Sequence, residues 1–205
     1  MTYLTVININ ETRPVWWQTE DNLEALHAIV EKSVPGDSGR VLWRVDKDAG
    51  KNGDLLVIKS DTIPDATGIV EQFGWPRLGY DEQVKTASMD GFLESLRPGQ
   101  RFRFRVAVSP SKQDPDSRKR YPLVGKNALK WTIDKLQDNG FVVHRIEQRS
   151  ESSPKLFKNG RPIFVKTTHY VGVVEIEDSV KARRALIEGI GRYKAYGNGM
   201  MTLMM

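Results

Sequence analysis

The chain has 205 residues, of which 28% are charged and 39% apolar, an ordinary composition for a soluble globular protein. Lys and Arg outnumber Asp and Glu by 31 to 26, and the formal net charge of +5 suggests a polyanionic partner. Disulfides and thiolate metal sites are excluded because the sequence has no cysteine. No signal peptide and no apolar run of about 18 residues is visible, so we expect a cytoplasmic protein.

The first half of the chain predicts the order β-α-β-β-α-β. Alternating and helical spacings of apolar residues define the elements, and Asp48, Gly50, Asn52 and Gly53 mark a loop between the second and third strands. The expected elements are a strand over residues 3–9, a helix over 21–33, strands over 40–45 and 54–59, a helix over 67–73 and a strand over 83–87.

The same order recurs in the second half. The expected elements are a strand over residues 101–108, a helix over 124–137, strands over 141–148 and 168–176, a helix over 179–188 and a strand over 200–204. A repeated βαββαβ pattern predicts an α+β protein with two tandem ferredoxin-like domains. We expect them to span residues 1–92 and 97–205, with a boundary between Met89 and Gly99.

Basic residues gather in three clusters of the second half. The strand RFRFRVAV places three arginines on one face, and two further clusters lie in the polar segment SPSKQDPDSRKRYPL and in a hairpin with an Asn159-Gly160 turn. Each cluster alone fits a solvated surface, but three together favour a nucleic-acid partner. The residues are Arg101, Arg103 and Arg105 in the strand, Lys112, Arg118, Lys119 and Arg120 in the segment, and Lys155, Lys158, Arg161 and Lys166 in the hairpin.

The chain ends on GIGRYKAYGNGMMTLMM, where glycines stand at positions 189, 191, 197 and 199. Two interpretations remain open: a tight turn between helix and strand, or a loop facing a phosphate with Arg192, Lys194 and nearby tyrosines. After the last helix, we expect Gly189 and Gly191 to end that helix and turn the chain. We expect Gly197 and Gly199 to let the last strand pass close to its neighbours.

The candidates for chemistry are three histidines. His144 and His169 lie in predicted strands, where a packed or surface role is expected, and no metal site is predicted. His27 lies on the first helix, at the edge of a buried stripe. It is either a half-buried structural residue or a group that exchanges protons near neutral pH.

Four features together resemble the CasE family, the CRISPR repeat-RNA endoribonucleases of the type I-E Cascade complex. They are L-x-x-L-H on the first helix, the S-P-S-K that follows a strand, R-K-R-Y-P-L before a helix, and the ending G-I-G-x-x-K-A-x-G-x-G. The resemblance spans the chain and implies two ferredoxin-like (RAMP) domains. It also implies binding of a repeat hairpin, one cut at the base of its stem, and entry into Cascade with the product RNA.

The resemblance assigns the helix histidine to His27 and implies a metal-independent reaction in which a ribose 2′-hydroxyl attacks the adjacent phosphate. His27 is then the expected general acid. Relatives carry a tyrosine three residues before the histidine, where this chain has Glu24. Glu24 can orient His27, act as the base, or slow the reaction through its negative charge.

The proton acceptor is left open among Glu24, Lys32, Tyr121, Tyr193 and a water molecule. Two alternatives to an active enzyme also stay open. One is an RNA-binding assembly subunit with little or no catalysis, and the other is a ferredoxin-like module that binds a different anion.

Overall fold

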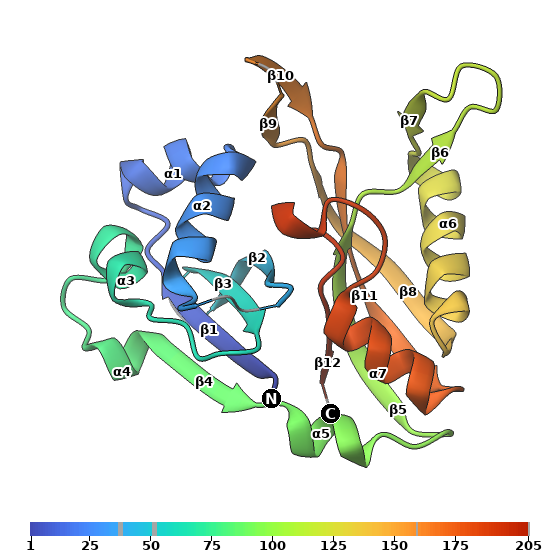
Figure 1. Ribbon diagram of the computed structural model, residues 1–205, viewed down its shortest axis with the longest axis horizontal. Coiled ribbons are helices and arrows are strands. Elements are labelled where there is room, and N and C mark those ends of the chain that lie inside the picture. The colour runs from blue at the N-terminus through green and yellow to red at the C-terminus, as the bar shows by residue number, and fades with distance from the viewer. Residues whose placement is uncertain (37–38, 51–52, 159, 205) are drawn as a thin grey trace. The chain divides into compact units, whose positions relative to one another are not determined.

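The computed structural model describes residues 1–36, 39–50, 53–158 and 160–204 (Figure 1). The chain forms two compact units. Unit 1 comprises Met1–Glu94, Pro154–Ile163 and Ala195–Gly197, and unit 2 comprises Ser95–Ser153, Phe164–Lys194 and Asn198–Met205. Segments that are remote in the sequence therefore pack within unit 1.

Unit 1 contains a four-stranded antiparallel sheet in the order β2-β3-β1-β4. Its strands are β1 (Tyr3–Ile9), β2 (Leu42–Gly50), β3 (Gly53–Ser60) and β4 (Val84–Ser88). Its helices are α1 (Pro14–Glu20), α2 (Leu23–Ser33), α3 (Thr67–Phe73) and α4 (Tyr80–Gln83), and α5 (Asp90–Ser95) follows β4. This strand order is that of a ferredoxin-like fold, as predicted.

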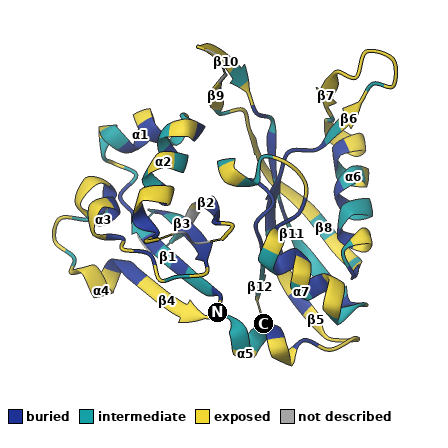
Figure 2. Cartoon of the chain, viewed as in Figure 1, coloured by how far each residue is buried: buried dark blue, intermediate teal, exposed yellow. Residues whose placement is uncertain are grey.

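One face of this sheet is covered by helices and carries the core of the unit (Figure 1 and Figure 2). Ile7 and Ile9 of β1 are fully buried, as are Leu26 and Val30 of α2, and α3 contacts both β1 and α2. The rings of Trp16 on α1 and Phe73 on α3 meet edge to face with centroids 5.3 Å apart. The period of two in β1 and the helical period in α2 thus give one shared core.

The histidine helix α2 begins at Leu23, two residues later than predicted. Asn22 is its N-cap, because the Asn22 side-chain oxygen accepts hydrogen bonds from the backbone N–H groups of Glu24 and Ala25, each at 3.2 Å. Helix α1, which ends just before this cap, was not predicted. It is only seven residues long and starts with Pro14 at its first turn, without a side-chain cap.

The loop predicted between the second and third strands is wrong in part. Asp48 and Gly50 belong to β2 and Gly53 belongs to β3, while Asn52 lies outside the described residues. The pairing of Gly50 with Gly53 extends the ladder beyond the apolar residues on which the prediction relied. The last part of β2 was therefore missed because it consists of polar and glycine residues, which are uncommon in strands.

Unit 2 contains a second four-stranded antiparallel sheet, in the order β12-β5-β11-β8. Its strands are β5 (Arg101–Val108), β8 (Phe141–Ser152), β11 (Thr167–Ile176) and β12 (Met201–Met204), and its helices are α6 (Gly125–Asp138) and α7 (Ser179–Glu188). The strand order matches that of the first sheet, which confirms the predicted α+β fold with two ferredoxin-like sheets.

Alternation in β5 separates a buried from an exposed face, as predicted. Phe102, Phe104 and Val106 are buried, whereas Arg101 and Arg103 are exposed. In the neighbouring strand β11, a side chain at Gly172 would collide with the carbonyl of Arg145. Glycine is needed there because the backbones of β11 and β8 approach closely.

Two short hairpins complete the described structure. Strands β6 (Ser111–Gln113) and β7 (Arg120–Pro122) pair within the polar segment SPSKQDPDSRKRYPL, for which no strand was predicted. Strands β9 (Lys155–Lys158) and β10 (Arg161–Phe164) form the predicted hairpin. None of the described helices is long and apolar enough to cross a membrane.

Candidate functional site

His27 lies at the boundary between the core and the surface of unit 1. Its neighbours on α2, Leu23, Leu26 and Val30, are buried, and the His27 side chain is 32% exposed. Its ring atom Nδ1 is buried and has no hydrogen-bond partner among the described residues. The ring is therefore buried at Nδ1 and accessible elsewhere, an arrangement that suits a proton donor or acceptor.

Glu31 is the carboxylate that pairs with this ring. Its Oε1 lies 3.8 Å from His27 Nδ1, one helical turn further along α2. Glu31 was not predicted from the sequence, although residues at i and i+4 are neighbours on a helix surface and the spacing can be read directly.

Tyr196 meets the same imidazole from another part of the chain. It ends the short 3-10 helix η1 (Lys194–Tyr196), and its ring centroid is 5.3 Å from that of His27 at an interplanar angle of 62°. This is an edge-to-face contact. The tail residue that touches the candidate catalytic group is thus an aromatic one.

Trp43 of β2 anchors this piece of the tail. The indole Nε1–H of Trp43 donates a hydrogen bond of 2.9 Å to the carbonyl of Ala195. Gly197 has a φ of +75°, and a Cβ there would stand 2.8 Å from the Trp43 ring. Gly197 therefore serves both a left-handed backbone and a close approach to an aromatic ring.

Glu24, the other predicted catalytic residue, is exposed on the first turn of α2. Within the described part of the chain, no hydrogen bond or ion pair joins its carboxylate to His27. Of the other proton-acceptor candidates, Lys32 lies on α2, and Tyr121 and Tyr193 belong to unit 2.

The hairpin β9-β10 is tied to the beginning of the histidine helix. The backbone N–H of Lys155 donates a hydrogen bond of 2.8 Å to the carbonyl of Asp21, and Lys155 also forms a β-bridge with Asn22. Asn22 is also the N-cap of α2, so the hairpin binds the backbone at the residues where the helix begins.

The hairpin presents cations and aromatic rings. Lys155 and Arg161 are exposed, Phe157 is 39% exposed and Phe164 is 65% exposed. The side chain of Lys158 and the predicted turn residue Asn159 lie outside the described part of the structure. Lys166 follows the second arm of the hairpin and forms an ion pair with Glu151.

The arginine row of β5 begins with a residue that already has partners. Arg101 donates from Nε to Glu175 Oε2 at 2.7 Å, and His144 Nε2 lies 3.0 Å from the same oxygen. Hydrogen bonds from Arg101 and then His144 hold the pKa of the Glu175 carboxyl below its ordinary value. Arg103 is exposed and Arg105 is half-buried on the same face.

The β6-β7 hairpin carries the next basic cluster. Its turn is ordered by Asp114, whose Oδ1 accepts hydrogen bonds from the backbone N–H and hydroxyl of Ser117 and from the backbone N–H of Asp116. The bond from the Ser117 backbone is the main cause that lowers the pKa of Asp114. The four basic residues on this hairpin and its turn are exposed: Lys112, Arg118, Lys119 and Arg120.

The remaining glycines of the tail have packing roles. Gly189 ends α7 with a φ of +75°, as predicted, and a Cβ at Gly191 would lie 3.0 Å from the ring of Trp131. A Cβ at Gly199 would collide with the carbonyl of Ile190. We expected Gly199 to let the last strand pass close to its neighbours, whereas the close group is the backbone of Ile190, which lies in no strand. Arg192 is exposed beside these glycines, and Lys194 is half-buried.

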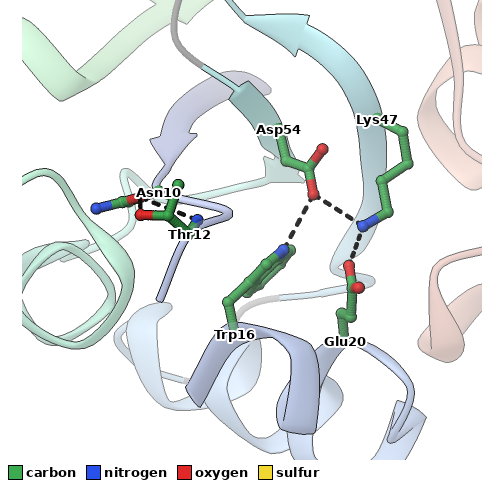
Figure 3. Close-up of polar contacts among 6 residues, drawn as sticks. All are labelled: Asn10, Thr12, Trp16, Glu20, Lys47 and Asp54. Atoms are coloured by element: carbon green, nitrogen blue, oxygen red, sulfur yellow. Dashed lines mark hydrogen bonds and ion pairs between the residues drawn. The ribbon is translucent and has the colours of Figure 1, made fainter. Parts of the chain in front are cut away.

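A second polar cluster in unit 1 surrounds the buried carboxylate of Asp54 (Figure 3). Asp54 Oδ2 accepts hydrogen bonds from Trp16 Nε1 at 3.0 Å and from Lys47 Nζ at 2.9 Å, and Lys47 also pairs with Glu20. Burial lowers the pKa of Lys47, but the hydrogen bonds to Glu20 and Asp54 outweigh it and the pKa is raised. The cluster borders a hollow of about 500 Å³ that the exposed Trp17 also lines.

Among the described residues, no group of three or more His, Asp or Glu side chains is arranged to hold a metal ion. The Lys47 cluster joins α1, β2 and β3 and satisfies a buried charge, which is a structural role. His27, the histidine that the sequence marked as a candidate for proton transfer, lies beside Glu31 and Tyr196.

Two ferredoxin-like sheets in one chain, with a helix histidine in the first, define the tandem ferredoxin-like class. A family model described as "CRISPR associated protein" matches residues 2–204. The CRISPR-associated endoribonuclease Cse3 of Thermus thermophilus is 24% identical over 193 residues, 87% of this chain and 86% of that protein. The chain belongs to this family of CRISPR-associated proteins, the Cse3 or CasE family, as its motifs predicted.

Solved structures agree with this assignment at the level of the fold. Thermus thermophilus Cse3 bound to an RNA representing a pre-cleavage complex has a TM-score of 0.79 at 22% identity, covering 100% of this chain and 99% of that one. A chain of a CRISPR RNA-guided surveillance complex has a TM-score of 0.69 at 20% identity, with 99% of each chain covered.

Proposed function

We propose that this protein is a metal-independent endoribonuclease that cleaves CRISPR repeat hairpin RNA, with His27 as general acid. The observation that carries the proposal is the half-exposed imidazole of His27, held at one edge on the first helix of a Cse3-type fold. Further support comes from the relative Cse3 of Thermus thermophilus, which is an endoribonuclease and has been solved with a pre-cleavage RNA.

In the proposed reaction the ribose 2′-hydroxyl loses its proton to a base and attacks the adjacent phosphorus. The bond from phosphorus to the 5′-oxygen then breaks, which leaves a 2′,3′-cyclic phosphate on one product. His27 gives its proton to the departing 5′-oxygen, so the leaving group departs as a neutral hydroxyl. The step also needs cations that stabilise the negative charge on the phosphate oxygens.

We propose Glu24 as a second catalytic residue, a candidate for the base that takes the proton from the ribose 2′-hydroxyl. It lies one turn before His27 and is exposed, so its carboxylate is accessible to a bound ribose. Lys32, Tyr121, Tyr193 and a water molecule stay candidates for the proton acceptor.

The RNA is held by basic residues that lie in four groups. Exposed cations favour RNA binding because they neutralise phosphates and so release the counterions of the RNA backbone. The proposed contacts are Arg101, Arg103 and Arg105 of β5; Lys112, Arg118, Lys119 and Arg120 of β6-β7; Lys155, Lys158, Arg161 and Lys166 of the β9-β10 hairpin and the residues after it; and Arg192 and Lys194 of the tail. After cleavage the protein stays on the product and joins a Cascade complex, a proposal supported by the similar chain in a surveillance complex.

The direct test is incubation with a repeat hairpin RNA in EDTA, beside the same RNA with a single 2′-deoxy nucleotide at the cut site. Cleavage of the first RNA and survival of the second are expected. A requirement for a divalent ion, or cleavage of the deoxy RNA, would contradict the mechanism. His27→Ala should abolish cleavage and leave the RNA dissociation constant nearly unchanged.

The second candidate is an RNA-binding assembly subunit without significant cleavage. Glu24 favours it, because it stands where the family resemblance implies a tyrosine and a carboxylate repels the scissile phosphate. Tight binding of the repeat hairpin with no product in EDTA or in magnesium would support this alternative.

A further inference from the structure

The imidazole of His27 is approached by two side chains from different parts of unit 1. We propose that Glu31 and Tyr196 are positioning residues: Glu31 directs the proton of the neutral ring to Nδ1, and the Tyr196 ring fixes the ring plane. Nε2 is then the atom presented to the substrate. The inference rests on the proposed role of His27 in RNA cleavage.

The burial of Nδ1 supports the role of Glu31. This atom is buried without a hydrogen-bond partner among the described residues, while the whole side chain is 32% exposed. The exposed part of the ring therefore belongs to the other atoms, which include Nε2. An ionised carboxylate can only accept, so a Glu31 oxygen beside Nδ1 favours the ring form that carries hydrogen there.

The distance allows this pairing with a small side-chain adjustment. Glu31 Oε1 is 3.8 Å from Nδ1, which is beyond hydrogen-bond range and within ion-pair range. Glu31 is 50% exposed, so its side chain has room to rotate. When the ring is charged, the same carboxylate stabilises it, and Nε2 carries the proton that is donated to the leaving group.

Tyr196 contacts the His27 ring from an anchored segment of the tail. Its ring lies edge to face with His27 at 5.3 Å, and the adjoining residues Ala195 and Gly197 are held by Trp43. Because Tyr196 is in contact with the imidazole, the imidazole cannot rotate about its χ2 angle without displacing Tyr196. The contact uses the aromatic ring, so a phenylalanine at position 196 would preserve it.

Ionisable side chains lie on α2 and on the elements that contact it, α1, α3 and β9. Among the described residues, Glu31 is the only one that forms an ion pair with the His27 ring. Further ionisable side chains on these elements are Glu24 and Lys32 on α2, Glu20 on α1, Glu71 on α3 and Lys155 on β9.

The first experiment measures the tautomer of His27 by ¹⁵N-detected NMR on the protein without RNA. The native ring should be mainly the Nδ1–H form, and Glu31→Ala should move it toward the Nε2–H form that histidine prefers in water. The matched control is Glu71→Ala, which removes an exposed helix carboxylate from α3 and should leave the tautomer unchanged. An unchanged tautomer in Glu31→Ala overturns the assignment of Glu31.

The second experiment measures single-turnover cleavage and RNA affinity together. Glu31→Ala and Tyr196→Ala should each lower the cleavage rate by about tenfold or more with little change in affinity, as expected for residues that orient a reacting group. Tyr196→Phe should keep the native rate, because it keeps the ring.

Loss of activity in Tyr196→Phe equal to that in Tyr196→Ala overturns the ring-positioning role. A native rate in Tyr196→Ala overturns it as well. If the native protein does not cleave RNA, the proposed function fails, but the tautomer measurement still decides the role of Glu31 because it needs no substrate.

Discussion

The aromatic ring of Tyr196 meets the imidazole of His27 edge to face, at 5.3 Å between centroids and 62° between ring planes. This contact joins the first predicted helix of the chain to the glycine-rich segment near its end. The family motifs at these two places, L-x-x-L-H and K-A-x-G-x-G, are thus neighbours in space through residues of unit 1. The tail contributes directly to the candidate site.

Substitution of Gly197 by alanine should lower cleavage more than RNA binding. The backbone φ of +75° is strained for alanine, and the new Cβ would stand 2.8 Å from the Trp43 ring. The segment with Tyr196 must then shift away from His27. Single-turnover rates and affinities measure the effect, and a native rate in Gly197→Ala would show that the path of this segment does not matter.

The matched control for this change is Gly68→Ala. Gly68 lies on α3 and its φ is outside the left-handed region. A Cβ added there would have no neighbouring atom within 4 Å. Alanine at this position should stabilise the fold slightly, by about 0.4–1 kcal/mol, and leave cleavage unchanged.

Replacement of two hairpin cations should weaken RNA binding without changing the chemistry. Lys155 and Arg161 are exposed on β9 and β10, so Lys155→Ala with Arg161→Ala removes up to two phosphate contacts. The slope of log K against log salt should flatten by about one to two units, since each phosphate contact contributes roughly 0.7–0.9. Binding isotherms at several salt concentrations measure this slope.

Lys85→Ala is the control, because Lys85 is exposed on β4, outside the proposed contacts. An equal loss of slope in the control would mean that general basicity, and not the hairpin, is responsible.

Much of the fold was readable from the sequence, because local patterns record burial. The strict alternation of β5 and the apolar stripe of α2 each predicted one buried face correctly. Helix α1 and the end of β2 were missed for the opposite reason. Trp16 and Trp17 lie in a short uncapped helix, and the residues that extend β2 as far as Gly50 are those typical of a turn.

The candidate site was predictable only in part. Glu31 stands one helical turn after His27, so its proximity follows from helix geometry alone. The contact with Tyr196 could not be inferred in this way. It depends on Trp43 and on the left-handed turn at Gly197, which are brought together by tertiary packing.

The pairing of Glu175 with Arg101 and His144 makes the stability of the fold depend on pH. The pKa of Glu175 is lowered in the folded protein, so its contribution is full above the ordinary value of 4.5 and is lost as pH falls through the lowered value. Native protein should therefore be more stable than Glu175→Gln near neutral pH, and the difference should vanish in acid. Urea denaturation at several pH values measures it.

The comparison variant is Glu147→Gln. Glu147 is half exposed, and its ion pairs with Arg145 and Arg149 are 3.6 and 3.8 Å long. The stability difference between native protein and Glu147→Gln should therefore be small at every pH. Equal pH profiles for the two variants would contradict the role assigned to Glu175.

Loss of the buried carboxylate of Asp54 should destabilise the fold far more than loss of an exposed one. The Asp54 side chain is 1% exposed and accepts hydrogen bonds from Trp16 and Lys47, so Asp54→Ala leaves a buried indole N–H without its partner. We expect a loss of about 1–3 kcal/mol in the free energy of unfolding. Asp138→Ala removes an exposed ion pair with Lys135 and should cost under about 1 kcal/mol. Urea midpoints measure both, and equal losses would show that the cluster in Figure 3 does not hold α1 against β2 and β3.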